Sequence, residues 1–332
     1  KPTLYLVGDD AAGDGIHSSW ITDLVLHHGV NPSLQDNPWV HVGKAVDALD
    51  GYILFDLGQD SENVATSLAG ILHAIAITPD MEPDAQGKGL SMVLDARGKD
   101  ESWAWTTYAG QFAADLAVEQ SEGTHGFLRD LAVMRGAFLY SEGDAPLRAT
   151  VAQALDTGAS VLGGGAPGDE QTWLATITSQ GALPVPASRA GNLSLFAKVV
   201  EPLLVQQNHI EGSPASEDGV HYVALVMGGG HRLDWLLNDF LRANWWGNPN
   251  RGAFTMNWEL HTLLGEWAPA VLGYLFDKAS AGSSKDFFVA APSGHGYASL
   301  GALPNPTSYA ESLAPSIVRS DLRVLSVVVD GG

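Results

Sequence analysis

Short runs of apolar and β-branched residues alternate with helical patterns along most of the chain, and this alternation constrains the fold most. Strands that are separated by helices pair in parallel, because each helix carries the chain back across the sheet. The chain has 332 residues, of which 45% are hydrophobic and 17% are charged, as in a packed globular protein. We therefore predict an α/β protein whose sheets are mostly parallel.

The pattern places strands at residues 3–7, 51–55, 90–94, 137–140, 160–162, 183–185, 222–227, 254–258, 287–290 and 324–329. It places helices at residues 16–28, 62–75, 147–156, 170–180, 232–243, 260–276 and 309–314. Pro269 should break the helix predicted over 260–276, because proline lacks the amide proton and clashes with the preceding turn.

The segment EGSPASEDG, residues 211–219, has the glycine, serine, proline and acid content of an exposed linker. It predicts an N-terminal α/β domain over 1–210 and a C-terminal β/α domain over 211–332. We expect the second domain to be an irregular or incomplete barrel. The chain ends soon after an apparent strand, so this domain could be truncated.

The chain carries 38 acidic and 17 basic residues, a net charge of −21, which repels phosphate backbones and disfavours nucleic acid as a partner. It has no cysteine, which excludes disulfides, thiolate zinc sites and cysteine nucleophiles. No apolar run reaches the length of a membrane span. The acidity favours a secreted or periplasmic protein, and a first residue other than methionine agrees with a trimmed or processed chain.

Polar and aromatic residues follow two neighbouring strands in the second half. Asn257, Trp258 and Glu259 come at the end of the predicted strand 254–258, and Ser293 to Tyr297, the sequence SGHGY, follow the strand 287–290. Parallel α/β folds build their sites at such strand ends. Rings stack on sugar faces and polar groups bind sugar hydroxyls, so this set suits sugar recognition.

The MNWE and SGHGY segments resemble those of the GxGYxYP family of putative glycoside hydrolases. In the first half, residues 51–82 and 89–103 are similar to the N-terminal region of that family, and residues 191–199 to the segment that joins its halves. The resemblance covers most of the chain and implies a carbohydrate ligand and glycosidic-bond hydrolysis. Two places depart from the pattern. No proline follows Tyr297 closely, and the strand end that carries SDGDN in the family holds Gly229 and His231 here.

Glycoside hydrolysis usually needs two carboxyl groups, one to protonate the leaving oxygen and one to act as nucleophile or base. Glu259 is the preferred general acid, because a neighbouring indole at Trp258 or ring at Tyr297 would raise its pKa by burial. An equally weighted reading makes Glu259 a first-turn residue of the next helix. Its partner is left open among Asp10, Asp95 and Asp234, each of which can also cap a helix or shape a turn.

Further candidates complete the predicted site. His231 is a candidate acid or base, and the substrate contacts are Asn257, Trp258, Tyr297, His295, Arg97 and Trp235. The run GGGH, residues 228–231, lacks the order of a nucleotide-binding loop, so we expect no cofactor. His231, His261 and His295 could meet around a metal ion, but without HxxxH or HExxH spacing we predict no metal site.

The sequence therefore predicts a carbohydrate-active protein, most simply a glycoside hydrolase. One alternative is a noncatalytic carbohydrate-binding or scaffold protein that lost its acids at Gly229 and His231. Another is a metal-dependent polysaccharide deacetylase.

Overall fold

The computed structural model describes residues 4–6, 16–34, 37–141, 143–164, 168–201, 204–206, 217–280, 286–296, 298 and 300–327. The chain forms two compact units. The middle unit is Asn31–Leu183, and the composite unit is Lys1–Val30 together with Pro184–Gly332. The units do not follow the order of the sequence, since the first thirty residues cluster with the second half. The domain boundary near residue 211 stays a prediction.

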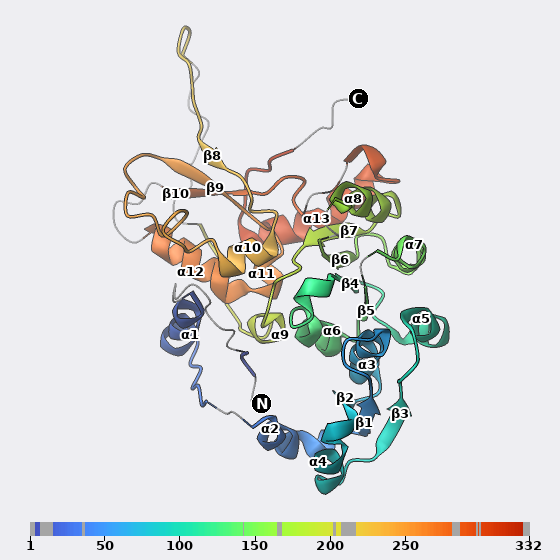
Figure 1. The fold of residues 1–332 in the computed structure, drawn as a ribbon. Helices are drawn as coiled ribbons and strands as arrows, with labels where there is room; N and C mark the ends of the chain where they lie inside the picture. The colour runs from blue at the N-terminus through green and yellow to red at the C-terminus, as the bar shows by residue number, and fades with distance from the viewer. Residues whose placement is uncertain are drawn as a thin grey trace. The chain divides into compact units, whose positions relative to one another are not determined.

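The middle unit holds two parallel sheets (Figure 1). The first has the order β2 (Ala74–Ile77), β1 (Gly51–Leu54), β3 (Met92–Asp95), and the second β5 (Phe138–Ser141), β4 (Leu116–Gln120), β6 (Ser160–Gly163), β7 (Leu183–Pro186). The border between the compact units falls within β7. The helices are α2 (Pro38–Ala45), α3 (Asp60–Ile71), α4 (Glu82–Gly87), α5 (Glu101–Tyr108), α6 (Arg129–Arg135), α7 (Ala145–Ala154) and α8 (Glu170–Ser179).

Helix α3 joins the two sheets of the middle unit, because it contacts β1 and β2 on one side and β5 on the other. Val64, Ala65 and Leu68 of α3 are fully buried, as a helix between two apolar sheet faces requires. A glycine lets it approach α6 closely. A β-carbon on Gly70 would lie 2.3 Å from the carbonyl oxygen of Val133.

The composite unit has a third parallel sheet, with the order β10 (Asp286–Ala290), β9 (Met256–Leu260), β8 (Val226–Met227). Beyond β10, Ala290 bridges to Leu325 in parallel. The helices are α1 (Ile16–His27), α9 (Leu193–Phe196), α10 (Leu233–Asn238), α11 (Leu264–Trp267), α12 (Pro269–Ser280) and α13 (Pro306–Ser320). Helix α1 is fixed to the second half of the chain by the Trp20 indole, which donates to the carbonyl of Leu237 at 2.8 Å.

The predicted α/β class with parallel strands is confirmed, since all three sheets are parallel. The described strands of the composite unit form an open sheet. Helix α12 begins at Pro269, where the break was expected. Several boundaries differ from the prediction, however. Strand β9 lies two residues later than 254–258, because Trp258 and Leu260, not the exposed Phe254, face the core.

Two strands were missed in the sequence. Strand β2 was assigned to the end of a helix over 62–75, and β4 was not assigned. The segment 222–227 forms a strand only at Val226 and Met227, and the predicted strand 324–329 is a single bridge at Leu325 in its described part. Leu4, Tyr5 and Leu6 form no strand.

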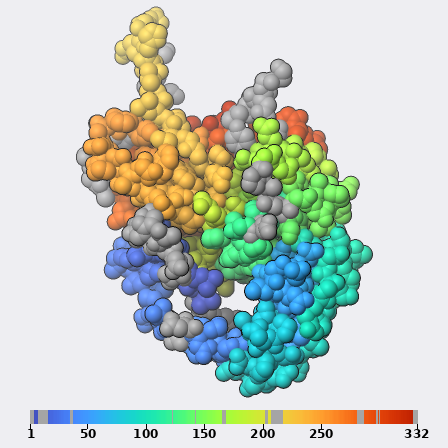
Figure 2. Space-filling model, in the orientation of Figure 1, coloured from blue at the N-terminus to red at the C-terminus, as the bar shows by residue number. Residues whose placement is uncertain are grey.

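The segment before β8 projects from the composite unit (Figures 1 and 2). Its residues 217–225 are exposed, Val223 at 82% and Tyr222 at 65%. Within the described ranges, no helix is both long enough and apolar enough to cross a bilayer.

Candidate functional site

The carboxyl ends of β8, β9 and β10 bring three polar segments together. Val289 pairs with Glu259 and Met227 with Trp258, so the three strands end at the same edge. Residues 228–231 follow β8, residues 259–262 close β9, and residues 291–296 follow β10. We call these three segments the strand-end site. As expected for a parallel sheet, residues far apart in the sequence meet at this edge.

The glycine run packs directly on the end of β9. A β-carbon on Gly230 would lie 1.8 Å from the carbonyl oxygen of Glu259, so no larger residue fits there. Gly229 has φ +106°, a backbone conformation that side chains rarely adopt, and it lies against the ring of Trp235. A β-carbon on Gly228 would lie 3.5 Å from Oε2 of Glu259. The glycines at 228–230 therefore allow the backbone to lie close to the carboxyl group of Glu259.

Glu259 lies inside β9 and not at a helix start, which corrects the first-turn reading. It is 6% exposed, and its Oε2 has no hydrogen-bond partner among the described residues. Burial raises its pKa, while hydrogen bonds from the Gly229 backbone and the Ser326 hydroxyl oppose the shift. Trp258 points to the opposite face of the strand, because successive side chains alternate. Its indole is therefore not the group that buries Glu259.

Three histidines gather at the same edge. His261 is fully buried, and burial, with smaller effects of His295 and His231, holds its pKa well below the usual range. Burial lowers the pKa of His295 to about 4 and also lowers that of His231, with a further contribution from Arg232. Neutral pH therefore leaves His261 and His295 uncharged.

The loop after β10 is held from two sides. The Thr262 hydroxyl donates to the Gly294 carbonyl at 3.1 Å, and the Tyr309 hydroxyl of α13 donates to the Ser293 carbonyl. Gly296, at φ +65°, leaves no space for a side chain, since a β-carbon would lie 2.0 Å from the carbonyl oxygen of Pro184. The position of His295 is thus fixed by β9, β7 and α13.

The sequence had also allowed the three histidines to meet around a metal ion. Among the described residues, no group of three or more histidine, cysteine, aspartate or glutamate side chains is placed to hold a metal ion. The described residues therefore give no support for a metal-ligand set at these histidines.

Other predicted residues of the composite unit have structural contacts. Trp258 is 5% exposed, donates to Asp286 at 2.8 Å and packs edge-on against Phe240 and Trp246. Asn257 donates to the Leu225 carbonyl at 3.0 Å and so helps to join β8 to β9.

Asp234 lies in the first turn of α10 and is fully buried. It accepts from Ser188, from the Arg189 backbone and from Arg232, all at 3.4 Å, and from the Trp235 backbone at 2.9 Å. Its carboxylate fixes the turn after β7. Trp235 packs against Phe240 and Trp245.

Asp95 and Arg97 lie in the middle unit, at the end of β3. The guanidinium donates to both carboxylate oxygens, at 2.8 and 2.7 Å, and holds the pKa of Asp95 below its usual range. Both side chains are about 40% exposed, as in a pair that shapes a surface turn. Asp10 and Tyr297 lie outside the described residues.

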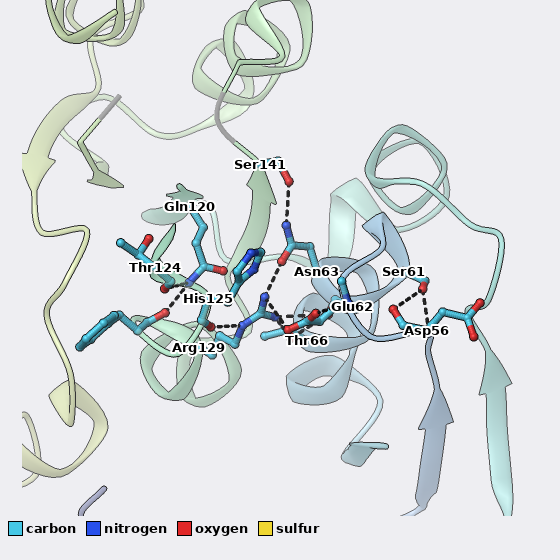
Figure 3. Close-up of polar contacts among 12 residues, drawn as sticks. Asp56, Ser61, Glu62, Asn63, Thr66, Gln120, Thr124, His125, Arg129 and Ser141 are labelled. Atoms are coloured by element: carbon cyan, nitrogen blue, oxygen red, sulfur yellow. Dashed lines mark hydrogen bonds and ion pairs between the residues drawn. The ribbon is translucent and has the colours of Figure 1, made fainter. Parts of the chain in front are cut away.

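The sequence analysis missed the strongest polar networks, which lie in the middle unit. Arg129 of α6 donates to Asn63 at 2.8 Å, to Thr66 and to the His125 carbonyl, and it pairs with Glu62 at 3.2 Å (Figure 3). Asn63 also donates to Ser141 at the end of β5 at 3.0 Å. This network ties α3, α6 and β5 together.

A second missed group is a buried ion pair. Arg148 and Glu119 are each 1% exposed and are joined at 2.6 Å, and Arg148 also pairs with Asp169 at 2.8 Å. The acid in the strand sequence LAVEQ was the only local signal for it.

Comparison with known proteins agrees with the resemblance of the motifs. Residues 219–331 match the model of the GxGYxYP putative glycoside hydrolase C-terminal domain, and residues 49–112 match that of the GxGYxYP_N second domain. Among curated proteins, none matches this sequence.

A solved structure is also similar, that of a putative hydrolase from Bacteroides thetaiotaomicron VPI-5482. The TM-score is 0.82 at 23% identity, over 95% of this chain and 63% of that one. At that identity the similarity shows the fold alone, and this chain spans less than two thirds of the other's length. The two matched domains together cover more than half of the chain. The protein therefore belongs to the GxGYxYP family of putative glycoside hydrolases.

Proposed function

We propose that the protein is a glycoside hydrolase in which Glu259 is the general acid. The observation that carries this proposal is the buried Oε2 of Glu259, which has no protein hydrogen-bond partner in the described chain and lies beside the glycine run. A general acid must hold its proton near neutral pH, and burial shifts the pKa of Glu259 in that direction.

The chemistry at this edge follows from the groups around Glu259. A protonated Glu259 would donate to the glycosidic oxygen as the bond to the anomeric carbon breaks. The carboxylate so formed would accept from the Gly229 backbone and from Ser326. The second carboxyl group stays a prediction among Asp10, Asp95 and Asp234. Asp234 is the least suited of these, because four hydrogen bonds already occupy it.

A noncatalytic carbohydrate-binding protein is the second candidate. The observation that favours it is the strand end after β8, which presents Gly229 and His231 at the place where the resemblance to the family implies acids. The backbone of Gly229 also disfavours an acid, because its φ of +106° is a conformation that side chains rarely adopt. The metal-dependent deacetylase finds no support in the described residues, which offer no metal-binding group.

The release of reducing sugar separates the two candidates. The purified protein is incubated with a broad panel of polysaccharides and oligosaccharides, and the products are measured as new reducing ends. Release that is lost in Glu259→Gln and kept in Glu266→Gln supports the hydrolase. Glu266 is an exposed glutamate of α11, so its variant controls for the change of residue type. Retention of a polysaccharide without release supports the binding protein.

A further inference from the structure

Helices α1 and α12 of the composite unit pack against each other (Figure 1) and border an open hollow of about 280 Å³. Ligand pockets usually have about 300–1,000 Å³, so this hollow suits one small ligand or one ring of a longer chain. Side chains about one turn apart share a face of each helix. Those that line the hollow include, from α1, Ser18, Thr22, Asp23 and His27, and, from α12, Tyr274 and Lys278.

The hollow lies apart from the strand-end site. Helix α12 follows the end of β9 and carries the chain back to the start of β10, as a helix between two parallel strands does. Tyr274 and Lys278 belong to its second half and therefore lie toward the amino ends of the strands. Glu259 lies near the carboxyl end of β9. A ligand in the hollow therefore has no need to touch Glu259.

Asp23 offers a buried carboxylate to the hollow. Its side chain is 10% exposed, with Oδ2 at 3.4 Å from Nε2 of His28. Oδ1 lies 4.0 Å from Nε2 of His27, which is longer than a hydrogen bond. Burial raises the pKa of Asp23, so the two imidazoles compensate only part of its loss of solvent. Hydrogen-bond donors of a ligand would offset the remainder.

The ring of Tyr274 gives the hollow an apolar wall that is held in place. Trp20, at 2% exposure, packs edge-on against it, with the ring centroids 5.4 Å apart. Burial raises the pKa of Tyr274 and the charge of Asp23 raises it further, so the two groups lie near each other. Ser18 and Thr22 are exposed and add hydroxyls that both donate and accept. A ring beside hydroxyls and a carboxylate suits a sugar.

The charged groups around the hollow favour an uncharged ligand. The carboxylate of Asp23 repels anions, and Asp277 adds negative charge near it. The ammonium of Lys278 lies 5.3 Å from the centroid of the Tyr274 ring and repels cations. A neutral ligand with several hydroxyls can donate to Asp23 and accept from Lys278 without burying an unpaired charge.

We propose that this hollow, which we call the α1–α12 site, is a second carbohydrate-binding site, in which a neutral sugar ring packs against Tyr274 and donates to Asp23. The class of ligand rests on the proposed function, whereas the binding itself does not depend on Glu259. The site would hold one part of a polysaccharide chain away from the strand-end site.

Electrophoresis through native gels that contain laminarin, galactomannan, xylan or dextran measures binding of neutral polysaccharides. Ser18→Trp fills the hollow from an exposed position. Ser102→Trp is the matched control, because Ser102 is an exposed serine near the start of α5 in the middle unit. We expect at least one probe to retard the wild type. Ser18→Trp should bind that probe at least about tenfold more weakly, since it loses the ring contact and the hydrogen bonds, while Ser102→Trp keeps the binding.

Asp23→Asn gives a second measurement, because it keeps the shape of the side chain and removes the charge. Hydrogen bonds to a charged group are stronger than those to a neutral one, so binding should weaken about tenfold. Urea unfolding shows whether each variant is folded, and Ser18→Trp decides the matter if Asp23→Asn is not. No retardation of the wild type by any of the four probes, or equal retardation of the wild type and Ser18→Trp, overturns the proposal.

The outcomes also separate the α1–α12 site from hydrolysis. Retardation that Ser18→Trp weakens, without any release of reducing sugar, supports the α1–α12 site and refutes the hydrolase. Release of reducing sugar by a protein whose retardation is the same in Ser18→Trp supports the hydrolase and overturns the α1–α12 site.

Discussion

Replacing Glu259 by glutamine tests the general acid with little change in shape. Glutamine keeps the volume and one carbonyl oxygen but has no proton to transfer. Loss of a general acid typically lowers the rate 10²- to 10⁴-fold, about 3–5 kcal/mol in the activation barrier. We therefore expect kcat on any cleaved polysaccharide to fall by that factor, while Glu266→Gln keeps the wild-type rate.

The stability of the same variant has a predictable sign. Burial raises the pKa of Glu259 in the folded state, so the folded protein binds this proton more tightly than the unfolded chain does. Its favourable contribution is full below the unfolded pKa and is lost as pH rises through the folded pKa. At pH 7 the wild-type protein has lost this stability, which amounts to about 1.4 kcal/mol for each unit by which the pKa of Glu259 is raised. The glutamine variant carries no such titrating group and so does not lose it. We expect it to be as stable as wild type at pH 7, or more so.

The assay pairs initial rates of reducing-sugar release with urea unfolding at pH 7 and pH 4.5. Turnover that survives in Glu259→Gln would refute the catalytic role. A drop of several kcal/mol in unfolding free energy, with modest loss of rate, would instead show that Glu259 supports the fold. Both results would contradict the argument from its unpartnered, buried oxygen.

Three further predictions concern the stability of the two units. Gly296→Ala should cost about 3 kcal/mol or more in urea unfolding, from its φ of +65° and the 2.0 Å approach to Pro184, whereas Gly301→Ala, with open space around it, should cost little. Burial lowers the pKa of His295 from 6.5 to about 4, so the folded state binds fewer protons than the unfolded chain does. The free energy of unfolding should therefore fall as pH drops from 6.5 to 4, by up to about 3 kcal/mol from this residue. A His295→Gln variant whose unfolding free energy keeps the wild-type dependence on pH would count against this. Glu119→Gln should destabilise the middle unit by up to about 3–5 kcal/mol, because Arg148 stays buried and keeps only its ion pair with Asp169. Asp115→Asn, which breaks an exposed pair with Arg135, should cost no more than about 1 kcal/mol. Equal losses in the two variants would refute the role of burial.

Local sequence patterns predicted the parallel α/β class and the strand ends that carry Glu259 and His295, because both depend on short-range periodicity. They left open whether Glu259 ends a strand or begins a helix, since an acid after an apolar run has the same local pattern in both settings. The aromatic cluster around Trp258 decides between these two settings. Phe240 and Trp246 both come from the turns that follow α10, and no local window contains all three residues.

Long-range packing explains the other differences. Trp20 contacts Leu237 across 217 residues of sequence, so nothing near either residue indicates that the first thirty residues cluster with the second half. The buried pair of Glu119 and Arg148 joins a strand to a helix 29 residues later. From the sequence alone, Glu119 is expected to be exposed to solvent, because a buried charge needs a partner that the sequence spacing does not reveal.

The two faces of β9 carry different kinds of side chain. Trp258 and Leu260 bury apolar surface on one face and hold the strand in place, while Glu259 and His261 are buried as polar groups on the other. Glu259 Oε2, His261 Nε2 and His295 Nδ1 lack hydrogen-bond partners in the described parts of the chain, at a cost of about 1–3 kcal/mol each. Against a total stability of about 5–15 kcal/mol, this is a large share. A substrate that hydrogen-bonds to Glu259 should therefore raise the unfolding temperature of the protein as well as bind to it.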